Sequence, residues 1–127
     1  ILTKTLHRMQ SAYGTEGTDV IACIGPGISL DSFEVGDEVY EAFRTENFPM
    51  EYISVWKPET HKYHIDLWAA NRLQLSDFGV PPRQIENAGI CTYRQHEDFF
   101  SARRLGIKSG RILSGIMLNG QEKGERK

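Results

Sequence analysis

The chain has 127 residues, a formal net charge of −2 and only two cysteines. This length predicts one domain with a sizeable core, residues 1–118, followed by a polar tail, residues 119–127. The balanced charge argues against a nucleic-acid-binding face, and the short apolar runs argue against a membrane span. Two cysteines in unrelated contexts do not make a disulfide framework, so we expect a cytoplasmic protein.

The first predicted element is a helix at the N-terminus. Leu2, Leu6, Met9 and Tyr13 recur at helical spacing, and Gly14 provides a stop signal. The helical spacing is already present at the first residues, and neither an initiator Met nor a capping residue precedes it. We therefore expect the chain to be a piece of a longer protein.

An apolar strand and a glycine turn are predicted next. The run from Asp19 to Ile24 is typical of a buried strand, on which Cys23 would be a small core residue. Gly25-Pro26-Gly27 ends it. Glycines allow a ligand to approach the backbone, and successive amides can bind an anion, but so short a turn is also an ordinary strand exit. Its spacing matches neither a dinucleotide fingerprint nor a Walker loop.

The middle of the chain predicts two helices with a loop between them. A short helix opens at Gly36-Asp37, and residues 45–58 are expected to form a loop, with a possible short strand at Tyr52–Trp56. A longer helix begins after Asp66 as its N-cap and ends at Gly79.

Histidines are the first residues to test for metal binding or catalysis. His61 and His64 would share a metal only on a helix, because in extended chain they point to opposite faces. No carboxylate or thiol completes a zinc set at a recognised spacing. His96 lies beside two carboxylates and is either a base or part of a solvated turn.

The last part of the chain predicts two strands, Ile85–Tyr93 and Arg111–Leu118, with an unusual loop between them. The notable residues of this region are aromatic or carry a guanidinium: Phe99, Phe100, Arg103, Arg104 and Arg111. A guanidinium presents a planar fork of donors to phosphate or carboxylate, and an aromatic ring can hold it or stack on a flat ligand. Alternatively, the phenylalanines anchor the loop and the arginines form surface ion pairs.

Helices and strands alternate along the chain, but no long helix joins the last two strands. We therefore expect an α+β fold, a mixed β-sheet with packed helices.

Several stretches resemble the YfiH/laccase-domain family. They are Cys91-Thr92-Tyr93, Phe99 to Arg104, Ser109-Gly110-Arg111, Ile24 to Ile28, Phe33-Glu34-Val35-Gly36 and His64-Ile65-Asp66-Leu67. The resemblance covers nearly the whole chain and implies the C-terminal part of the family domain, with a YfiH/laccase-domain-like α+β fold. These proteins were first called multicopper polyphenol oxidases and are now understood as purine nucleoside phosphorylases with adenosine deaminase and methylthioadenosine phosphorylase activity.

The resemblance implies cleavage of a nucleoside with phosphate as co-substrate, or deamination of adenosine. The family site is built on a Cys and two His that can bind zinc, or copper under the older name. We expect these residues in a missing N-terminal part, so this chain alone would be inactive, with no catalytic residue or metal ligand; Cys91 is no replacement. The residues expected to line the pocket or bind an anion are Gly25, Pro26, Phe99, Phe100, Arg103, Arg104 and Arg111. A non-catalytic ligand-binding or assembly module is the alternative.

Overall fold

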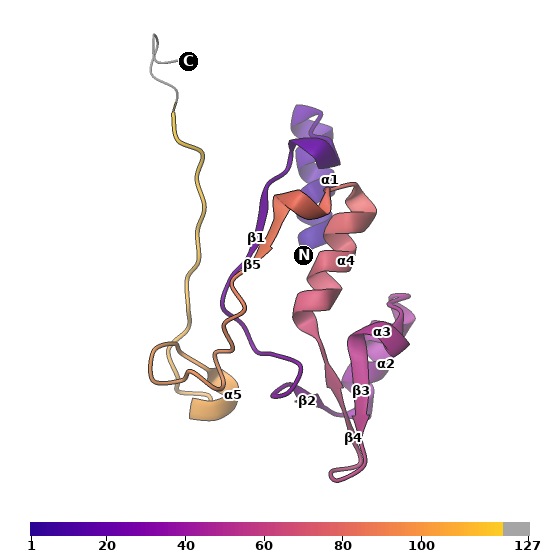
Figure 1. Ribbon diagram of the computed structural model, residues 1–127, viewed down its shortest axis with the longest axis vertical. Coiled ribbons are helices and arrows are strands. Elements are labelled where there is room, and N and C mark those ends of the chain that lie inside the picture. Colours follow the sequence, from indigo (N-terminus) through magenta and orange to yellow (C-terminus); the bar gives the residue numbers. More distant parts are fainter. Residues whose placement is uncertain (121–127) are drawn as a thin grey trace.

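The computed structural model describes residues 1–120 and has an α+β fold, which confirms the predicted class (Figure 1). The helices are α1 (Leu2–Tyr13), α2 (Asp37–Thr45), α3 (Met50–Ile53), α4 (Leu67–Phe78) and α5 (Ala102–Leu105), with 3₁₀ turns η1 (Gly17–Asp19) and η2 (Pro82–Gln84). The strands are β1 (Ala22–Ile24), β2 (Glu34–Val35), β3 (Ser54–Lys57), β4 (Lys62–Ile65) and β5 (Ile85–Asn87). Among the described residues, no helix is both long and apolar enough to cross a membrane.

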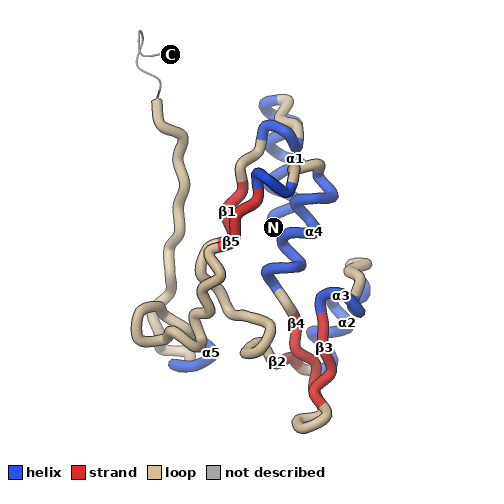
Figure 2. Tube along the Cα trace, in the orientation of Figure 1, coloured by secondary structure: helices blue, strands red, loops and turns tan. Residues whose placement is uncertain are grey.

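The strands divide into two separate sheets. Strands β1 and β5 pair in parallel, whereas β2, β4 and β3 form an antiparallel sheet in that order (Figure 2). Parallel and antiparallel pairing were expected in one mixed sheet, and here they lie in different parts of the molecule. We call these parts the parallel half, with α1, β1 and β5, and the antiparallel half, with α2, α3 and β2 to β4.

Helix α1 covers one face of the parallel half together with α4 (Figure 2). It ends as predicted at Gly14, which has a positive φ of 68° and donates its N–H to Gln10 O. Leu6 is buried, but Tyr13 at the end of the predicted apolar stripe is 84% exposed. The buried residues of this core are Leu6, Val20, Leu75, Val80 and Ile85.

The prediction that Cys23 is a core residue is wrong, because its side chain is exposed. Side chains alternate between the two faces of a strand, and here Val20 and Ala22 face α1 and α4. Ile21 and Cys23 therefore lie on the opposite face, which no described element covers.

The antiparallel half has its own core, made of Val35, Met50, Ile53, Ile65 and Ala70. Residues 45–58 were predicted as a loop with a possible short strand at Tyr52–Trp56. Strand β3 lies close to that position, but helix α3 was not predicted. Helix α3 is a single turn whose Met50 and Ile53 are both buried. A turn this short has too little periodicity to be recognised from sequence.

Helix α4 runs between the two halves (Figure 1). Its boundaries are as predicted: Asp66 Oδ1 accepts a hydrogen bond from Ala69 N at 3.0 Å, and Gly79 closes the helix with a φ of 101°. Ala70 near its start belongs to the core of the antiparallel half, and Leu75 near its end belongs to the core of the parallel half.

Two strand predictions near the end of the chain need correction. The strand expected at Ile85–Tyr93 is paired only over β5, followed by one isolated bridge between Gly27 and Cys91. Residues 111–118 form no strand with any described residue, and Leu113 is 97% exposed. An apolar run predicts a strand but cannot show whether a neighbour is present to pair with it. Residues 121–127 of the predicted tail lie outside the described residues.

Candidate functional site

Two loops that are distant in sequence lie against each other. Gly27 N donates to Ile90 O and Thr92 N donates to Gly27 O, both at 3.1 Å. The turn Gly25-Pro26-Gly27 is therefore held beside Cys91-Thr92-Tyr93, and the predicted pocket residues Gly25 and Pro26 lie near the family-like motif. We call residues 25–33 and 90–111 together the Cys91 loop cluster.

Cys91 joins the two loops. Its side chain is 7% exposed, and its Sγ accepts hydrogen bonds from Ser29 N at 3.3 Å and from Ser29 Oγ at 3.1 Å. Ser32 Oγ lies 3.7 Å from the same sulfur. Sequence reasoning missed both serines, because nothing in their spacing relates them to a cysteine more than fifty residues away.

These contacts change the acidity of Cys91. Burial raises the pKa of the thiol, but the hydrogen bonds from Ser29, from the Arg94 backbone and from Ser32 together lower it by more, so that the pKa falls from the ordinary 9.0 to about 7. The buried sulfur of Cys91 contacts both Ser29 and Ser32 and so links the two loops.

The ring of Phe100 packs against Gly110. A side-chain carbon at Gly110 would lie 2.8 Å from the Cζ atom of Phe100, so the ring occupies the space that any larger residue would need. Phe99 closes a turn, because its N–H donates to Gln95 O at 3.0 Å. Ser101, which is buried, then caps α5 by accepting a hydrogen bond from Arg104 N at 3.3 Å. Phe100 thus has a clear packing role in the loop.

The three predicted arginines have different surroundings, although all are exposed. Arg103 Nη1 donates to Glu34 O at 2.7 Å, and its guanidinium lies 5.1 Å from the centre of the Phe33 ring. Arg111 Nη1 donates to Gly110 O at 3.2 Å, within its own turn.

Arg104 differs from the other two arginines. Its guanidinium lies 5.0 Å from the centre of the Tyr93 ring. Within residues 1–120 this guanidinium makes no hydrogen bond and no ion pair. The side chain is thus oriented by stacking while its planar fork of donors is free.

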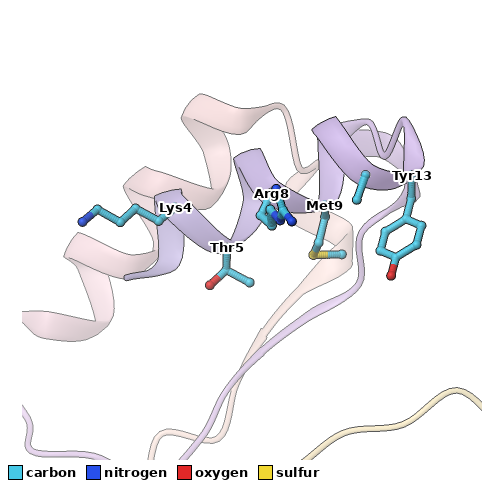
Figure 3. A pocket seen from close by; sticks show the side chains of 6 residues that line it. Lys4, Thr5, Arg8, Met9 and Tyr13 are labelled. Atoms are coloured by element: carbon cyan, nitrogen blue, oxygen red, sulfur yellow. The ribbon is translucent and has the colours of Figure 1, made fainter.

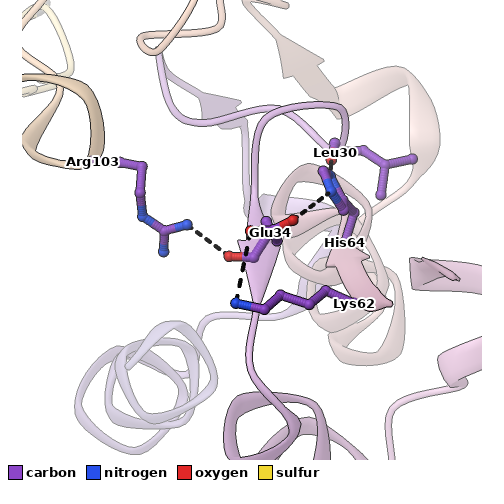
Figure 4. A network of polar contacts seen from close by, with 5 residues as sticks. All are labelled: Leu30, Glu34, Lys62, His64 and Arg103. Carbon is purple, nitrogen blue, oxygen red and sulfur yellow. Dashed lines mark hydrogen bonds and ion pairs between the residues drawn. The ribbon is translucent and has the colours of Figure 1, made fainter. Parts of the chain in front are cut away.

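A polar network ties α5 to the antiparallel sheet (Figure 4). The Glu34 carboxylate lies 4.0 Å from both Lys62 Nζ and His64 Nε2, and the backbone of Glu34 accepts the bond from Arg103. His64 Nδ1 donates to Leu30 O at 2.8 Å; a carbonyl can only accept, so the proton is on Nδ1. His64 is therefore a satisfied buried residue that positions the loop at Leu30.

Trp68 supplies a polar group that sequence reasoning did not single out. Its Nε1–H is buried and meets no acceptor among residues 1–120. It lies beside the glycine turn, since a side-chain carbon at Gly27 would be 3.4 Å from this nitrogen. Buried donors normally have a partner, so an acceptor here would have to come from outside the described residues.

The described residues do not match the metal site that the resemblance implies. Within residues 1–120, no three His, Cys, Asp or Glu side chains are grouped closely enough to hold a metal ion. His61, at a turn with a φ of 53°, and His64, which is committed to Leu30, do not form a pair.

A separate depression follows one side of α1 (Figure 3). It is lined only by side chains of that helix: Lys4, Thr5, Arg8, Met9, Ala12 and Tyr13. Such a hollow between side chains of one exposed helix has no convergent polar groups from other elements, so we do not assign it a function.

Comparison with known proteins identifies relatives along the chain. Residues 1–119 match the family described as multi-copper polyphenol oxidoreductase laccase. The chain is 65% identical over 119 residues to a purine nucleoside phosphorylase of Bacteroides thetaiotaomicron, covering 94% of this chain and 44% of the relative. It is 53% identical over 95 residues to adenosine deaminase RL5 of an unknown prokaryotic organism, covering 75% and 36% of the two chains.

A solved structure agrees with the fold. The crystal structure of YlmD from Geobacillus stearothermophilus superposes with a TM-score of 0.70 at 33% identity, covering 82% of this chain and 38% of that chain. The chain thus spans less than half the length of these relatives. The expectation that it is the C-terminal part of the family domain is not confirmed by these matches. With residues 1–119 matched, the chain belongs to the multi-copper polyphenol oxidoreductase laccase family, the YfiH/laccase-domain proteins that its motifs resemble.

Proposed function

We propose that this chain is part of a purine nucleoside phosphorylase and that the Cys91 loop cluster forms the anion-binding wall of its active site. The relative that is 65% identical carries that name. The observation that carries the assignment of the wall is Arg104, whose guanidinium stacks on Tyr93 and has no hydrogen-bond or ion-pair partner in residues 1–120. The ligands would be a small nucleoside and phosphate.

Arg104 suits the electrostatic requirement of phosphorolysis. In that reaction the bond between the ribose C1′ and the base nitrogen breaks, its electron pair leaves with the base, and the base takes up a proton. A phosphate oxygen forms the new bond to C1′, giving ribose-1-phosphate. The enzyme must hold a multiply charged anion beside C1′, and a bidentate guanidinium does this with strong, charge-assisted hydrogen bonds.

The other predicted site residues take different roles in this proposal. Gly25 and Pro26 line the wall next to Trp68, whose free Nε1–H can donate to a ligand. Phe99 shapes the loop, and Phe100 keeps its place by packing on Gly110. Arg103 and Arg111 hold the loop through backbone carbonyls. Catalytic residues and any metal ligands would come from the remainder of the protein.

Adenosine deamination is a second candidate, because the relative that is 53% identical is named an adenosine deaminase. The two reactions differ in their need for phosphate: deamination replaces the amino group with water, releases ammonia and leaves the glycosidic bond intact. The third possibility, a non-catalytic ligand-binding or assembly module, predicts neither product.

The activity can be tested in a chimera in which residues 1–119 replace the matching segment of the Bacteroides thetaiotaomicron relative. We expect adenosine and inosine to give free base and ribose-1-phosphate only when phosphate is present. Inosine and ammonia from adenosine without phosphate would support the deaminase instead. A folded chimera that gives no product under either condition would leave the non-catalytic module as the better account.

The role of Arg104 is tested in the same chimera. Loss of a charged hydrogen-bond donor typically costs about 1.5–3 kcal/mol, so Arg104→Ala should raise the KM for phosphate about tenfold or more. Arg104→Lys keeps the positive charge but loses the planar fork of donors, so its KM for phosphate should lie between those of the wild type and Arg104→Ala. Arg83→Ala on η2 is the matched control and should leave the phosphate KM unchanged. If Arg104→Ala behaves like Arg83→Ala, Arg104 does not bind the anion.

A further inference from the structure

The parallel half has one covered face and one bare face. Helices α1 and α4 lie over Val20 and Ala22, whereas Ile21 on the other side is 67% exposed and Cys23 is exposed. The register pairs Cys23 with Glu86 of β5, which is exposed as well. No described element lies over this side of the two strands (Figure 1).

A bare face is unusual for this kind of sheet. Antiparallel sheets often leave one face in water, but parallel sheets are buried on both faces, and their strands are continuous apolar runs. Residues 20–24, Val-Ile-Ala-Cys-Ile, are such a run, because the residues that point to each face of the strand are apolar. Two paired strands are also few for a stable sheet. The sequence of β1 thus fits a strand with neighbours that residues 1–120 do not provide.

A second unpaired segment lies close to the end of β1. Residues 112–118 are extended without strand pairing to any described residue (Figure 2). Leu113, Ile116 and Leu118 are between 75% and 97% exposed. This segment passes the end of β1, since Ser114 Oγ lies 3.6 Å from where a side-chain carbon of Gly25 would be. Two apolar, unpaired stretches therefore adjoin on the same molecule.

We propose that the bare face of β1 and β5, together with residues 112–118, is the surface on which the rest of the family domain packs, through apolar segments that cover this face. In the relatives, the matched part makes up only 44% of one chain and 38% of another, so more than half of each chain is available to cover it. The inference rests on family membership and not on the proposed activity.

A second copy of the chain fits this surface less well. Two copies related by a two-fold axis would bring two Glu86 side chains toward each other on the face, and like charges placed opposite one another are unfavourable. A covering strand of different sequence can leave Glu86 at the rim or donate a hydrogen bond to it. The rest of the domain is therefore the favoured occupant.

Cys23 is a natural probe of this surface, and Cys91 is an internal reference. Both thiols are alkylated with N-ethylmaleimide, and each labelled peptide is quantified by mass spectrometry, first in the 127-residue chain and then in the chimera with the Bacteroides thetaiotaomicron relative. We expect Cys23 to react rapidly in the chain and at least about tenfold more slowly in the chimera, whereas the buried Cys91 is slow in both.

Three outcomes separate the possibilities. Equal rates at Cys23 in the chain and in a folded chimera would show that the face stays bare and would overturn the proposal. Protection of Cys23 in the chain alone, rising with concentration and accompanied by a dimer in sedimentation, would assign the face to a second copy and also overturn it. Protection only in the chimera supports the proposal, whether or not the chimera cleaves nucleosides.

A pair of substitutions gives a second readout. Ile21→Asp places a charge on the bare face, and Tyr13→Asp places one at an exposed position of α1, where the residue is 84% exposed. In the chimera, Ile21→Asp should lower the melting temperature clearly and Tyr13→Asp should not. In the 127-residue chain, both substitutions should have small effects. Equal effects of the two in the chimera would contradict the assignment of the face.

Discussion

The two halves of the molecule differ in how completely they bury their own sheets. In the antiparallel half, Ile65 of β4 is fully buried in a core with Ile53 of α3, and the opposite face of the sheet carries Val55 at 41% exposure. In the parallel half, Leu6 and Leu75 are buried on one face, but Ile21 is 67% exposed on the other. An open face is normal for an antiparallel sheet and abnormal for a parallel one. The comparison indicates that the antiparallel half is self-contained and the parallel half is not.

Helix α4 contributes residues to the cores of both halves. Ala70 packs into the core of the antiparallel half and Leu75 into the core of the parallel half. In the Cys91 loop cluster, residues 25–33 connect β1 to β2, and residues 90–111 contact both halves: Ile90 O accepts from Gly27 N beyond β1, and Arg103 donates to Glu34 O of β2. The candidate site is therefore supported by one complete and one incomplete sheet.

The largest expected effect comes from comparing one buried and one bare isoleucine in the 127-residue chain. Ile65→Ala removes a fully buried side chain and should lower the free energy of unfolding by about 2–5 kcal/mol. Ile21→Ala should change it by no more than about 0.5 kcal/mol, as expected for an exposed residue. Urea unfolding followed by circular dichroism measures both. Similar losses for the two variants would mean that Ile21 is already covered in the isolated chain.

A close contact between Gly17 and Gly79 joins η1 to the end of α4 in the parallel half. A side-chain carbon at Gly17 would lie 2.2 Å from the backbone of Gly79, so η1 and the end of α4 touch through their main chains. Gly17→Ala must separate them and should cost about 1–3 kcal/mol in urea unfolding. Gly115→Ala, where a side-chain carbon meets nothing within 4 Å, is the control and should be nearly neutral. A neutral Gly17→Ala would show that this contact is loose.

The smallest effect concerns pH and the loop cluster. The pKa of Cys91 in the folded chain, about 7, lies below its ordinary 9.0, so folding favours the thiolate. The resulting stabilisation is fully present above pH 9 and is lost as the pH falls through 7. The free energy of unfolding should therefore rise from pH 7 to pH 9 more steeply in the wild type than in Cys91→Ala. Parallel pH profiles for the two proteins would mean that the hydrogen bonds to Cys91 do not favour the thiolate.

Local signals made part of the fold predictable from sequence. Gly14, Asp66 and Gly79 mark helix ends through their own backbone or side-chain chemistry, and the structure has those ends. Helix α3 was missed because one turn contains too little periodicity. The exposure of Cys23 was missed because an apolar run indicates what a strand is suited to, not what covers it in a given chain.

The candidate site was less predictable, because its contacts join distant residues. The resemblance singled out two loops that are distant in sequence, and the structure places Gly27 beside Cys91. The individual roles could be seen only in the structure. No sequence pattern shows that Arg103 bonds to Glu34 or that Ser29 bonds to Cys91. Nor does one show that, of the three predicted arginines, Arg104 is the one whose guanidinium has no such partner within residues 1–120. Phe100 was expected at a pocket, and its contact with Gly110 is a packing contact.

The most direct test of the account is amide hydrogen exchange, measured in the 127-residue chain and in the chimera with the Bacteroides thetaiotaomicron relative. Amides of β3 and β4 should be protected in both proteins, because the antiparallel half contains its own core. Amides of β1, β5 and residues 112–118 should exchange rapidly in the chain and become protected in the chimera. Equal protection of β1 and β4 in the chain alone would contradict the claim that the parallel half is completed by the rest of the domain.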